Sequence, residues 1–392
     1  MSSSITDKNS NLLWSKSFII IALVNALAFL GFNMATAGFP VYLSSLDIDE
    51  SVVGFSTSLA AVGSLLMRPF AGYLCAKISC KSFSFMGLAL MAVPCAISMV
   101  AINTKVLLLM RFLQGIGWGI SSTCCATIIA QCVPSTRLSE GVGYAGAISS
   151  VTTAFASSLA IFILQSMNGI SMIISIGLVI ALAILLLLLM RPTEIATSNQ
   201  VRKNPIVICP PNAIVPAVMI FFITFGYSPI ITFVTRFASE SGFAGVSLFF
   251  LVYAIATIVI RPVTGIFTDK YGCVLPTVFA MTTSVLSLVF LLVARNSMIF
   301  YFAGALSGIS TGMGMNALQT MALKGATTQT RAATMSTYLF GFDFGMAIGA
   351  GISGSLVKTY TYNAMYGIAA IAPCVGLLFF ILICAVKRKR VR

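Results

Sequence analysis

The sequence predicts an all-α membrane protein with twelve transmembrane helices, arranged as two pseudo-symmetric six-helix bundles. Three observations predict this class: charge is scarce, apolar residues fall in long runs, and the second half repeats the first. Only 8% of the 392 residues are charged and 58% are hydrophobic, whereas about 25% of the residues of a soluble protein carry charge. This composition excludes a soluble enzyme. One transmembrane helix needs about 20 apolar residues, so twelve fit in this chain with short connections.

Charges, prolines and polar clusters divide the chain into twelve apolar runs. The first six lie near residues 17–42, 52–75, 82–102, 106–131, 141–166 and 168–190. The second six lie near residues 213–236, 243–268, 275–294, 297–323, 332–357 and 362–386. We therefore expect an N-terminal bundle at 1–190, a polar cytoplasmic linker at 191–212, and a C-terminal bundle at 213–392 with a basic tail.

The net charge of +14 is explained by membrane topology. With a cytoplasmic N-terminus, alternation of the spans puts sixteen basic residues inside, namely Lys8, Lys16, Lys77, Lys81, Arg137, Arg191, Arg202, Lys203, Lys270, Lys324, Arg331 and the five of the tail KRKRVR. Four lie outside, and Arg68, Arg111 and Arg261 lie within spans. This bias predicts a plasma (inner) membrane protein with both termini cytoplasmic and its basic clusters at lipid head groups. We expect no nucleic acid partner.

An internal repeat relates the two halves at an offset of 193 residues. The segment LLMRPFAGYLCAKISCK (65–81) aligns with IVIRPVTGIFTDKYGCV (258–274), and Gly115 and Gly119 align with Gly308 and Gly312. Two duplicated six-helix halves are the architecture of an alternating-access transporter whose site lies between the halves at the membrane midplane.

The chain resembles the major facilitator superfamily over nearly its whole length. That family's loop pattern, Gly-x-x-x-Asp-Arg/Lys-x-Gly, is matched in the second half by Gly265, Asp269, Lys270 and Gly272. The resemblance implies that the aspartate locks the two halves together on the cytoplasmic side. We expect Asp269 to find a basic partner, with Arg137 and Arg331 the nearest by topology.

The first-half copy of the loop keeps Gly72 and Lys77 but has Ala76 and Ser79 where the family has the acid and the last glycine. An aspartate-centred latch is therefore expected only from the second half. Arg111-x-x-x-Gly115 resembles the proton-linked drug exporters, and YLFGFDFGMAIGAGISGSL (338–356) resembles a late span of the drug/metabolite:proton antiporter group. The proline-containing glycine motif of those exporters is missing from GVGYAGAISSV (141–151).

Two charged residues lie deep in predicted spans and are the candidates for proton coupling. Asp343 lies eleven residues into its run, about 17 Å deep at a rise of about 1.5 Å per residue. A charged aspartate at that depth costs at least about 2.5 kcal/mol, so it must be paired, line water or be protonated. Arg111 lies about 9 Å deep and either opposes an anion or snorkels to the outer interface. A purely structural role stays open for both.

Polar residues deep in other spans are candidates for lining the substrate cavity. They are Asn25, Asn33, Gln114, Tyr227, Asn316 and Gln319. Taken alone, each is more often a hydrogen bond between helices than a contact with a ligand. Gly341, Gly345 and Gly349 recur every four residues, which predicts a face for close helix packing with Asp343 on the opposite side.

Histidine is absent, and the ten cysteines lie mostly in apolar runs, where a thiol behaves as a small hydrophobe. We therefore assign no catalytic residue, metal site or cofactor, and we do not expect an enzyme. The expected function is proton-coupled efflux of a small hydrophobic or amphipathic compound by a monomer. The alternatives are proton-coupled uptake of a small metabolite, which the missing proline motif favours, and a transporter-like membrane sensor.

Overall fold

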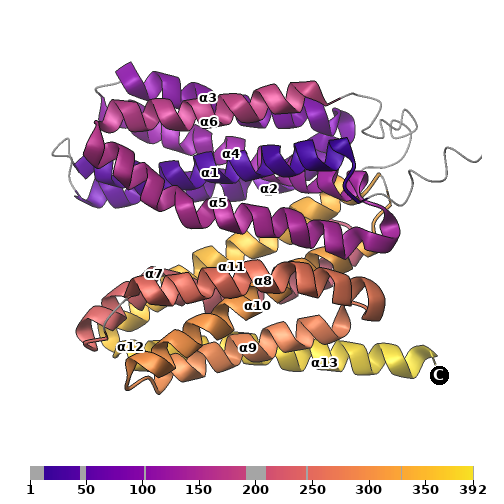
Figure 1. Cartoon of the computed structure of the whole chain (residues 1–392). Helices are drawn as coiled ribbons and strands as arrows, with labels where there is room; N and C mark the ends of the chain where they lie inside the picture. The colour runs from indigo at the N-terminus through magenta and orange to yellow at the C-terminus, as the bar shows by residue number, and fades with distance from the viewer. Residues whose placement is uncertain are drawn as a thin grey trace, which may run out of the picture. The chain divides into compact units, whose positions relative to one another are not determined.

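The computed structural model describes residues 13–44, 50–100, 103–190, 209–243, 246–327 and 329–391. In these residues the chain forms α-helices and one short 3-10 helix, η1, and no strand (Figure 1). The elements of the first half are α1 (Lys16–Ser44), α2 (Glu50–Lys77), α3 (Cys80–Val100), α4 (Thr104–Cys132), η1 (Ser135–Arg137), α5 (Leu138–Ser166) and α6 (Gly169–Leu189). Those of the second half are α7 (Pro211–Glu240), α8 (Val246–Tyr271), α9 (Val274–Leu292), α10 (Ser297–Lys324), α11 (Arg331–Thr359), α12 (Tyr362–Ala369) and α13 (Ile371–Val391).

Twelve segments of the described residues are long and apolar enough to cross a membrane. The expected twelve spans are therefore confirmed, with ends that differ by a few residues. The last span differs inside as well, because α12 ends at Ala369 and α13 begins at Ile371. Pro373 explains this break, since a proline cannot donate a backbone hydrogen bond and its ring clashes with the carbonyl four residues earlier, which is that of Ala369.

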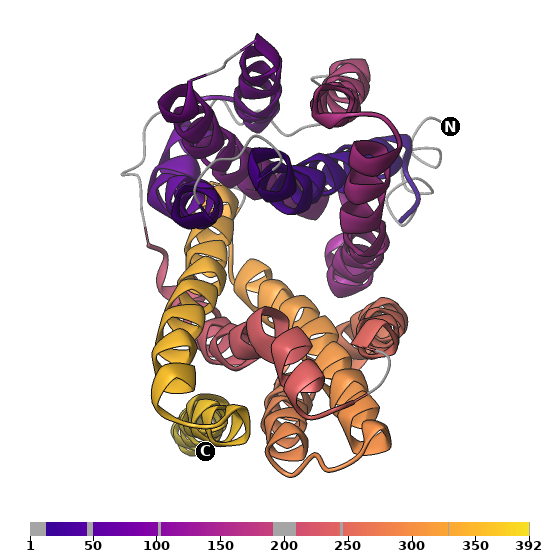
Figure 2. The same cartoon turned by 90° about the vertical axis from the view of Figure 1, so that its left-hand side faces the viewer.

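The chain divides into two compact units. The first unit comprises residues 1–141, 148–210 and 326–337, and the second unit comprises residues 142–147, 211–325 and 338–392. Figure 2 looks along the helices and shows the bundle that each unit forms. The division into 1–190 and 213–392 stays a prediction, and residues 191–208 of the expected linker lie outside the described residues.

The repeat governs how the helices begin. Asn103 and Asn296, 193 residues apart, cap the N-termini of α4 and α10, and each side-chain oxygen accepts a backbone N–H at 2.9 Å. Asn168 and Thr361 cap α6 and α12 at the same offset. These side chains satisfy backbone donors that a helix start leaves without partners. At these four positions the two halves therefore share helix starts.

The repeat also governs how helices pack inside each unit. In the first unit, a Cβ on Gly119 of α4 would lie 2.9 Å from the carbonyl oxygen of Ser64 in α2. In the second unit, a Cβ on Gly312 of α10 would lie 3.2 Å from the carbonyl oxygen of Thr257 in α8. Both glycines and both carbonyls are related by the offset of 193. Small residues thus let α2 approach α4, and α8 approach α10, in the same way.

Candidate functional site

Arg111 and Gln114 of α4 come together in the interior of the first unit. Arg111 is 1% exposed, and its Nη1 donates to Oε1 of Gln114 at 2.6 Å. Gln114 in turn donates to Sγ of Cys95 in α3 at 2.9 Å. The guanidinium lies over the ring of Phe39 in α1, 5.3 Å from its centroid. The burial argues against a snorkelling arginine.

The other edge of the Arg111 guanidinium has no partner among the described residues. Both Nε and Nη2 are buried and make no hydrogen bond. These two nitrogens form the edge on which a guanidinium takes a carboxylate through two parallel hydrogen bonds. The unfilled edge of Arg111 thus has the geometry that a carboxylate requires, and its role in proton coupling stays a prediction.

Asn25 and Asn33 lie two turns apart on α1 and face α5. Nδ2 of Asn25 donates to Oγ of Ser149 at 2.9 Å. Nδ2 of Asn33 donates to the carbonyl of Phe29 at 2.8 Å and lies 3.5 Å from Oγ1 of Thr153. These contacts fit the alternative reading, in which each asparagine joins two helices.

Asp343 lies at the middle of α11, twelve residues after the helix begins at Arg331, which is about 18 Å along it. The three-glycine face predicted for this helix packs on α7: a Cβ on Gly345 would lie 2.5 Å from the carbonyl oxygen of Phe221, and one on Gly349 would lie 2.6 Å from that of Phe225. Asp343 is two residues from Gly345, or about 200° round the helix. The half-buried carboxyl group therefore projects away from the α7 contact.

The repeat places Arg68 of α2 and Arg261 of α8 at equivalent positions, but their surroundings differ. In the first unit, Nη1 of Arg68 donates to Oγ of Ser122 at 2.7 Å and to Oγ1 of Thr123 at 3.1 Å. In the second unit, Nη2 of Arg261 donates to Sδ of Met315, the equivalent of Ser122, at 3.1 Å. Its Nε is buried and has no hydrogen-bond partner among the described residues.

Tyrosines surround Arg261 in the second unit. Tyr227 of α7 stacks on Tyr253 of α8 with ring centroids 5.6 Å apart, and the guanidinium of Arg261 lies within electrostatic range of both and of Tyr338 of α11. Asn316 holds the backbone here, because its Nδ2 donates to the carbonyl of Arg261 at 2.7 Å. The structure thus brings together two of the predicted cavity residues, Tyr227 and Asn316. Gln319 lies three residues after Asn316 on α10 and is half-buried.

The α8–α9 corner carries the complete loop pattern. Gly265 is buried in α8, and Gly272 has a φ of 90°, which favours glycine. Oδ1 of Asp269 lies 3.6 Å from Nζ of Lys324, the last residue of α10. Asp269 therefore has a basic partner inside the second unit, one that sequence reasoning did not single out. Lys270 is exposed and lies over the ring of the adjacent tyrosine, 5.2 Å from its centroid.

The partners expected for Asp269 belong to the first unit. Arg137 ends η1, and its Nε and Nη2 donate to the two carboxylate oxygens of Glu140 at 2.7 and 2.6 Å. Arg331 begins α11. A pairing of Asp269 with either arginine stays a prediction.

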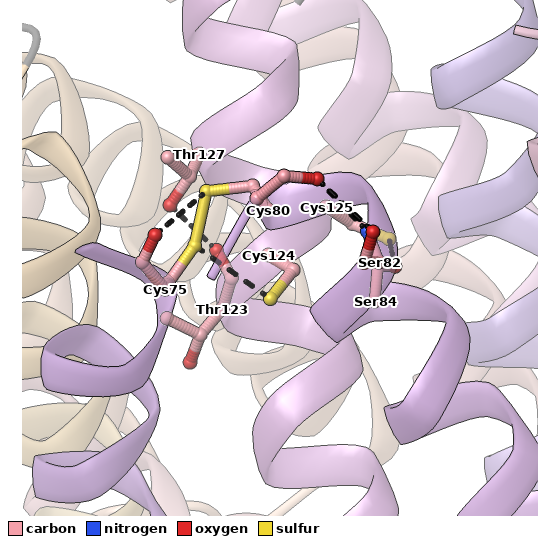
Figure 3. Close-up of a disulfide and its surroundings, with 9 residues drawn as sticks. Cys75, Cys80, Ser82, Ser84, Thr123, Cys124, Cys125 and Thr127 are labelled. Atoms are coloured by element: carbon pink, nitrogen blue, oxygen red, sulfur yellow. Dashed lines mark hydrogen bonds between the residues drawn. A yellow bond between two sulfur atoms is a disulfide. The ribbon is translucent and has the colours of Figure 1, made fainter. Parts of the chain in front are cut away.

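The α2–α3 corner is closed by a disulfide between Cys75 and Cys80 (Figure 3). Sγ of Cys124, on α4, lies 3.9 Å from Sγ of Cys75. Gly72 is buried, whereas Lys77 is exposed and lies 4.5 Å from the centroid of the Tyr73 ring. The expectation that the cysteines act only as small hydrophobes is wrong for this pair. A helix corner that brings Cα atoms of residues 75 and 80 to 5.1 Å allows the bond, and a search for C-x-x-C spacing does not detect it.

Comparison with known proteins identifies the fold and a group of relatives. A family model described as the Major Facilitator Superfamily matches residues 21–327 and 217–392. The quinolone resistance protein NorA of Staphylococcus aureus is 29% identical over 134 residues, which is 34% of this chain and 34% of NorA. The match to NorA thus spans well under two thirds of either chain.

Two solved structures share the fold at low sequence identity. The E. coli fucose:proton symporter FucP has a TM-score of 0.74 at 15% identity, over 93% of this chain and 98% of that one. The human organic anion transporter MFSD10 has a TM-score of 0.77 at 13% identity, over 93% of this chain and 98% of that one.

Proposed function

The chain belongs to the Major Facilitator Superfamily of transporters, and from that premise we propose that it exports a small hydrophobic or amphipathic compound in exchange for protons. The observation that carries this proposal is Asp343 at the middle of α11. The other acids with described side chains, Glu140, Glu240 and Asp269, lie near helix ends. A carboxyl group at midplane is costly when charged, so cycles of protonation and release couple naturally to a change between conformations.

Arg111 supports the same proposal from the first unit. Its free Nε–Nη2 edge suits a negative charge that is present in one state of the cycle and absent in another. The relationship to NorA, whose name describes quinolone resistance, favours export of a drug-like compound. Uptake by symport is the second candidate, favoured by the lack of the proline motif in residues 141–151.

Proteoliposomes with an imposed pH gradient separate the two candidates, using a panel of lipophilic dyes as substrates. Antiport drives a dye into vesicles with an acidic lumen, since protons leave as the dye enters. Symport drives it into vesicles with an alkaline lumen. If neither pH gradient changed the accumulation of any dye by the wild-type protein, proton coupling would be contradicted.

Asp343→Asn tests the carboxyl group itself. The amide keeps the shape of the side chain but cannot release a proton, so gradient-driven accumulation should be abolished while the yield of folded protein is unchanged. Glu240→Gln, at the exposed end of α7, is the matched control and should transport like the wild type. Full accumulation by Asp343→Asn would remove this residue from the mechanism.

Two substitutions of Arg111 separate the effect of its charge from the effect of its shape. Arg111→Ala should lose transport, and Arg111→Lys should be partly active, because lysine keeps the charge but lacks the planar two-nitrogen edge. Wild-type transport by the alanine variant would assign Arg111 a structural role.

The gate of the proposed cycle is the pair of helix corners at Gly72 and Lys77 and at Gly265, Asp269, Lys270 and Gly272. Contacts that exist in one state alone set the balance between states by their differential energy. Asp269→Asn should therefore make cytoplasmic-side cysteines more reactive toward a thiol reagent. Equal labelling of the variant and the wild type would mean that this corner does not hold the gate.

A further inference from the structure

We propose that Arg261 and the tyrosines around it form an anion subsite, so that the transported compound is an organic anion: an apolar body bearing a carboxylate or a similar oxyanion. This inference rests on the proposed transport function and names its substrate class. It is carried by geometry within the second unit.

The strongest evidence is the difference between two equivalent arginines. Arg68 is 2% exposed and its guanidinium is held by the hydroxyl groups of Ser122 and Thr123. At the offset of 193, these two residues become Met315 and Asn316. The second half has therefore lost both hydroxyl groups that satisfy the arginine in the first half, and it has a thioether and a side-chain amide in their place.

The thioether that replaces Ser122 is a poor hydrogen-bond partner for a cation. Nη2 of Arg261 has the thioether sulfur of Met315 at 3.1 Å, and within the described part of the chain Nε has no partner. A thioether is a poor hydrogen-bond acceptor. The Asn316 side chain donates its amide to the backbone carbonyl of Arg261, so it does not serve the guanidinium through that contact. The Nε–Nη2 edge is thus short of oxygen, and this edge fits a carboxylate with two parallel hydrogen bonds.

A permanently charged group with unfilled donors is expensive in an apolar interior, and a bound anion removes the cost. Arginine keeps its proton in proteins, so it cannot escape the cost by becoming neutral. The surroundings suit a ligand that is only partly polar. Tyr227 and Tyr253 supply a stacked pair of rings at 5.6 Å, and both side chains are half-buried, as Arg261 is. A cationic compound, in contrast, would be repelled here.

The anion subsite can be tested by measuring ligand binding to the purified protein, without any proton gradient. The probe is 1-naphthoate, compared with the neutral amide 1-naphthamide and the cation 1-naphthylmethylammonium, and the readout is stabilisation against thermal unfolding in detergent. We expect naphthoate to stabilise the wild type and the other two to have little effect. Equal stabilisation by naphthamide would overturn the proposal.

Three variants separate a binding arginine from a structural one. Arg261→Gln should weaken naphthoate binding about tenfold or more, the loss expected for hydrogen bonds to a charged group, while the unliganded protein is at least as stable as the wild type. Arg68→Gln, the equivalent position, should instead destabilise the unliganded protein, because it removes satisfied hydrogen bonds. Met315→Ser restores the first-half acceptor and should weaken binding with the arginine still present. Arg295→Gln, exposed in the same unit, is the control for loss of charge and should bind like the wild type.

The outcomes distinguish this inference from the transport mechanism. If Arg261→Gln loses stability as Arg68→Gln does, or keeps wild-type affinity for naphthoate, the anion subsite is wrong even if dye export is proton-driven. If naphthoate binds as expected but no pH gradient moves any compound, the subsite stands and the proposed coupling fails.

Discussion

Replacing Gly345 with alanine tests whether the α7–α11 contact depends on the absence of a side chain. The new Cβ would overlap Oγ1 of Thr224 and lie 2.5 Å from the carbonyl oxygen of Phe221. The two helices must then separate. That movement stretches two hydrogen bonds between them, from Oγ1 of Thr224 to the carbonyl of Phe342 (3.1 Å) and from Oγ of Ser228 to the carbonyl of Met346 (2.7 Å).

The magnitude follows from these contacts and from a control on the same helix. Overpacking costs about 1–3 kcal/mol, and each hydrogen bond between membrane helices contributes about 0.6 kcal/mol. Gly351→Ala is the control, because a Cβ there meets nothing within 4 Å. Both substitutions gain about the same helix propensity. Their difference in unfolding free energy should therefore be about 2–4 kcal/mol, with Gly345→Ala the less stable.

The assay is reversible unfolding of the purified protein in mixed micelles, titrated with a denaturing detergent and followed by helical circular dichroism. The two variants are compared with each other and with the wild type. Equal unfolding midpoints for Gly345→Ala and Gly351→Ala would refute the close contact between α7 and α11.

The two helix corners yield further predictions. Burial raises the pKa of the Cys273 thiol, while Lys324 lowers it and Asp269 raises it. Lys324→Gln should therefore reduce the thiolate fraction, shifting the pH profile of Cys273 alkylation upward, and an unshifted profile would place Lys324 too far away to act. Peptide mapping of the unreduced protein should find Cys75 linked to Cys80, and Cys80→Ser should make Cys75 available to an alkylating reagent. Recovery of Cys75 and Cys80 as free thiols without reductant would show that the disulfide at this corner does not form.

The fold could be predicted almost completely from the sequence because its determinants are local or repetitive. Apolar runs of membrane-spanning length and one offset of 193 residues specify the helices and their pairing. Even the N-caps Asn103 and Asn296 follow that offset. The break between α12 and α13 is harder to predict from the sequence. Other prolines, such as Pro69 and Pro262, lie inside continuous helices of the same protein.

The candidate site was only partly predictable, because depth in a span does not say what a side chain meets. Arg111 and Gln114 were singled out separately, and only the structure shows the hydrogen bond that joins them. Arg261 was not among the candidate site residues that the sequence predicts. The signal that identifies it was nevertheless present in the sequence, since Ser122 aligns with Met315 at the repeat offset. A difference between equivalent positions becomes meaningful once the contacts of Arg68 are known.

The disulfide gives the two equivalent corners of the protein sensitivity to different solution conditions. The first corner is a covalent ring between residues 75 and 80, whose chain-entropy contribution, for so short a loop, is about 2 kcal/mol. A reductant opens it, whereas ionic strength leaves a covalent bond intact. The second corner contains a pair of charges, with Lys324 38% exposed, so added salt weakens it by screening and a reductant does not. Thiol and salt titrations therefore address the two corners one at a time.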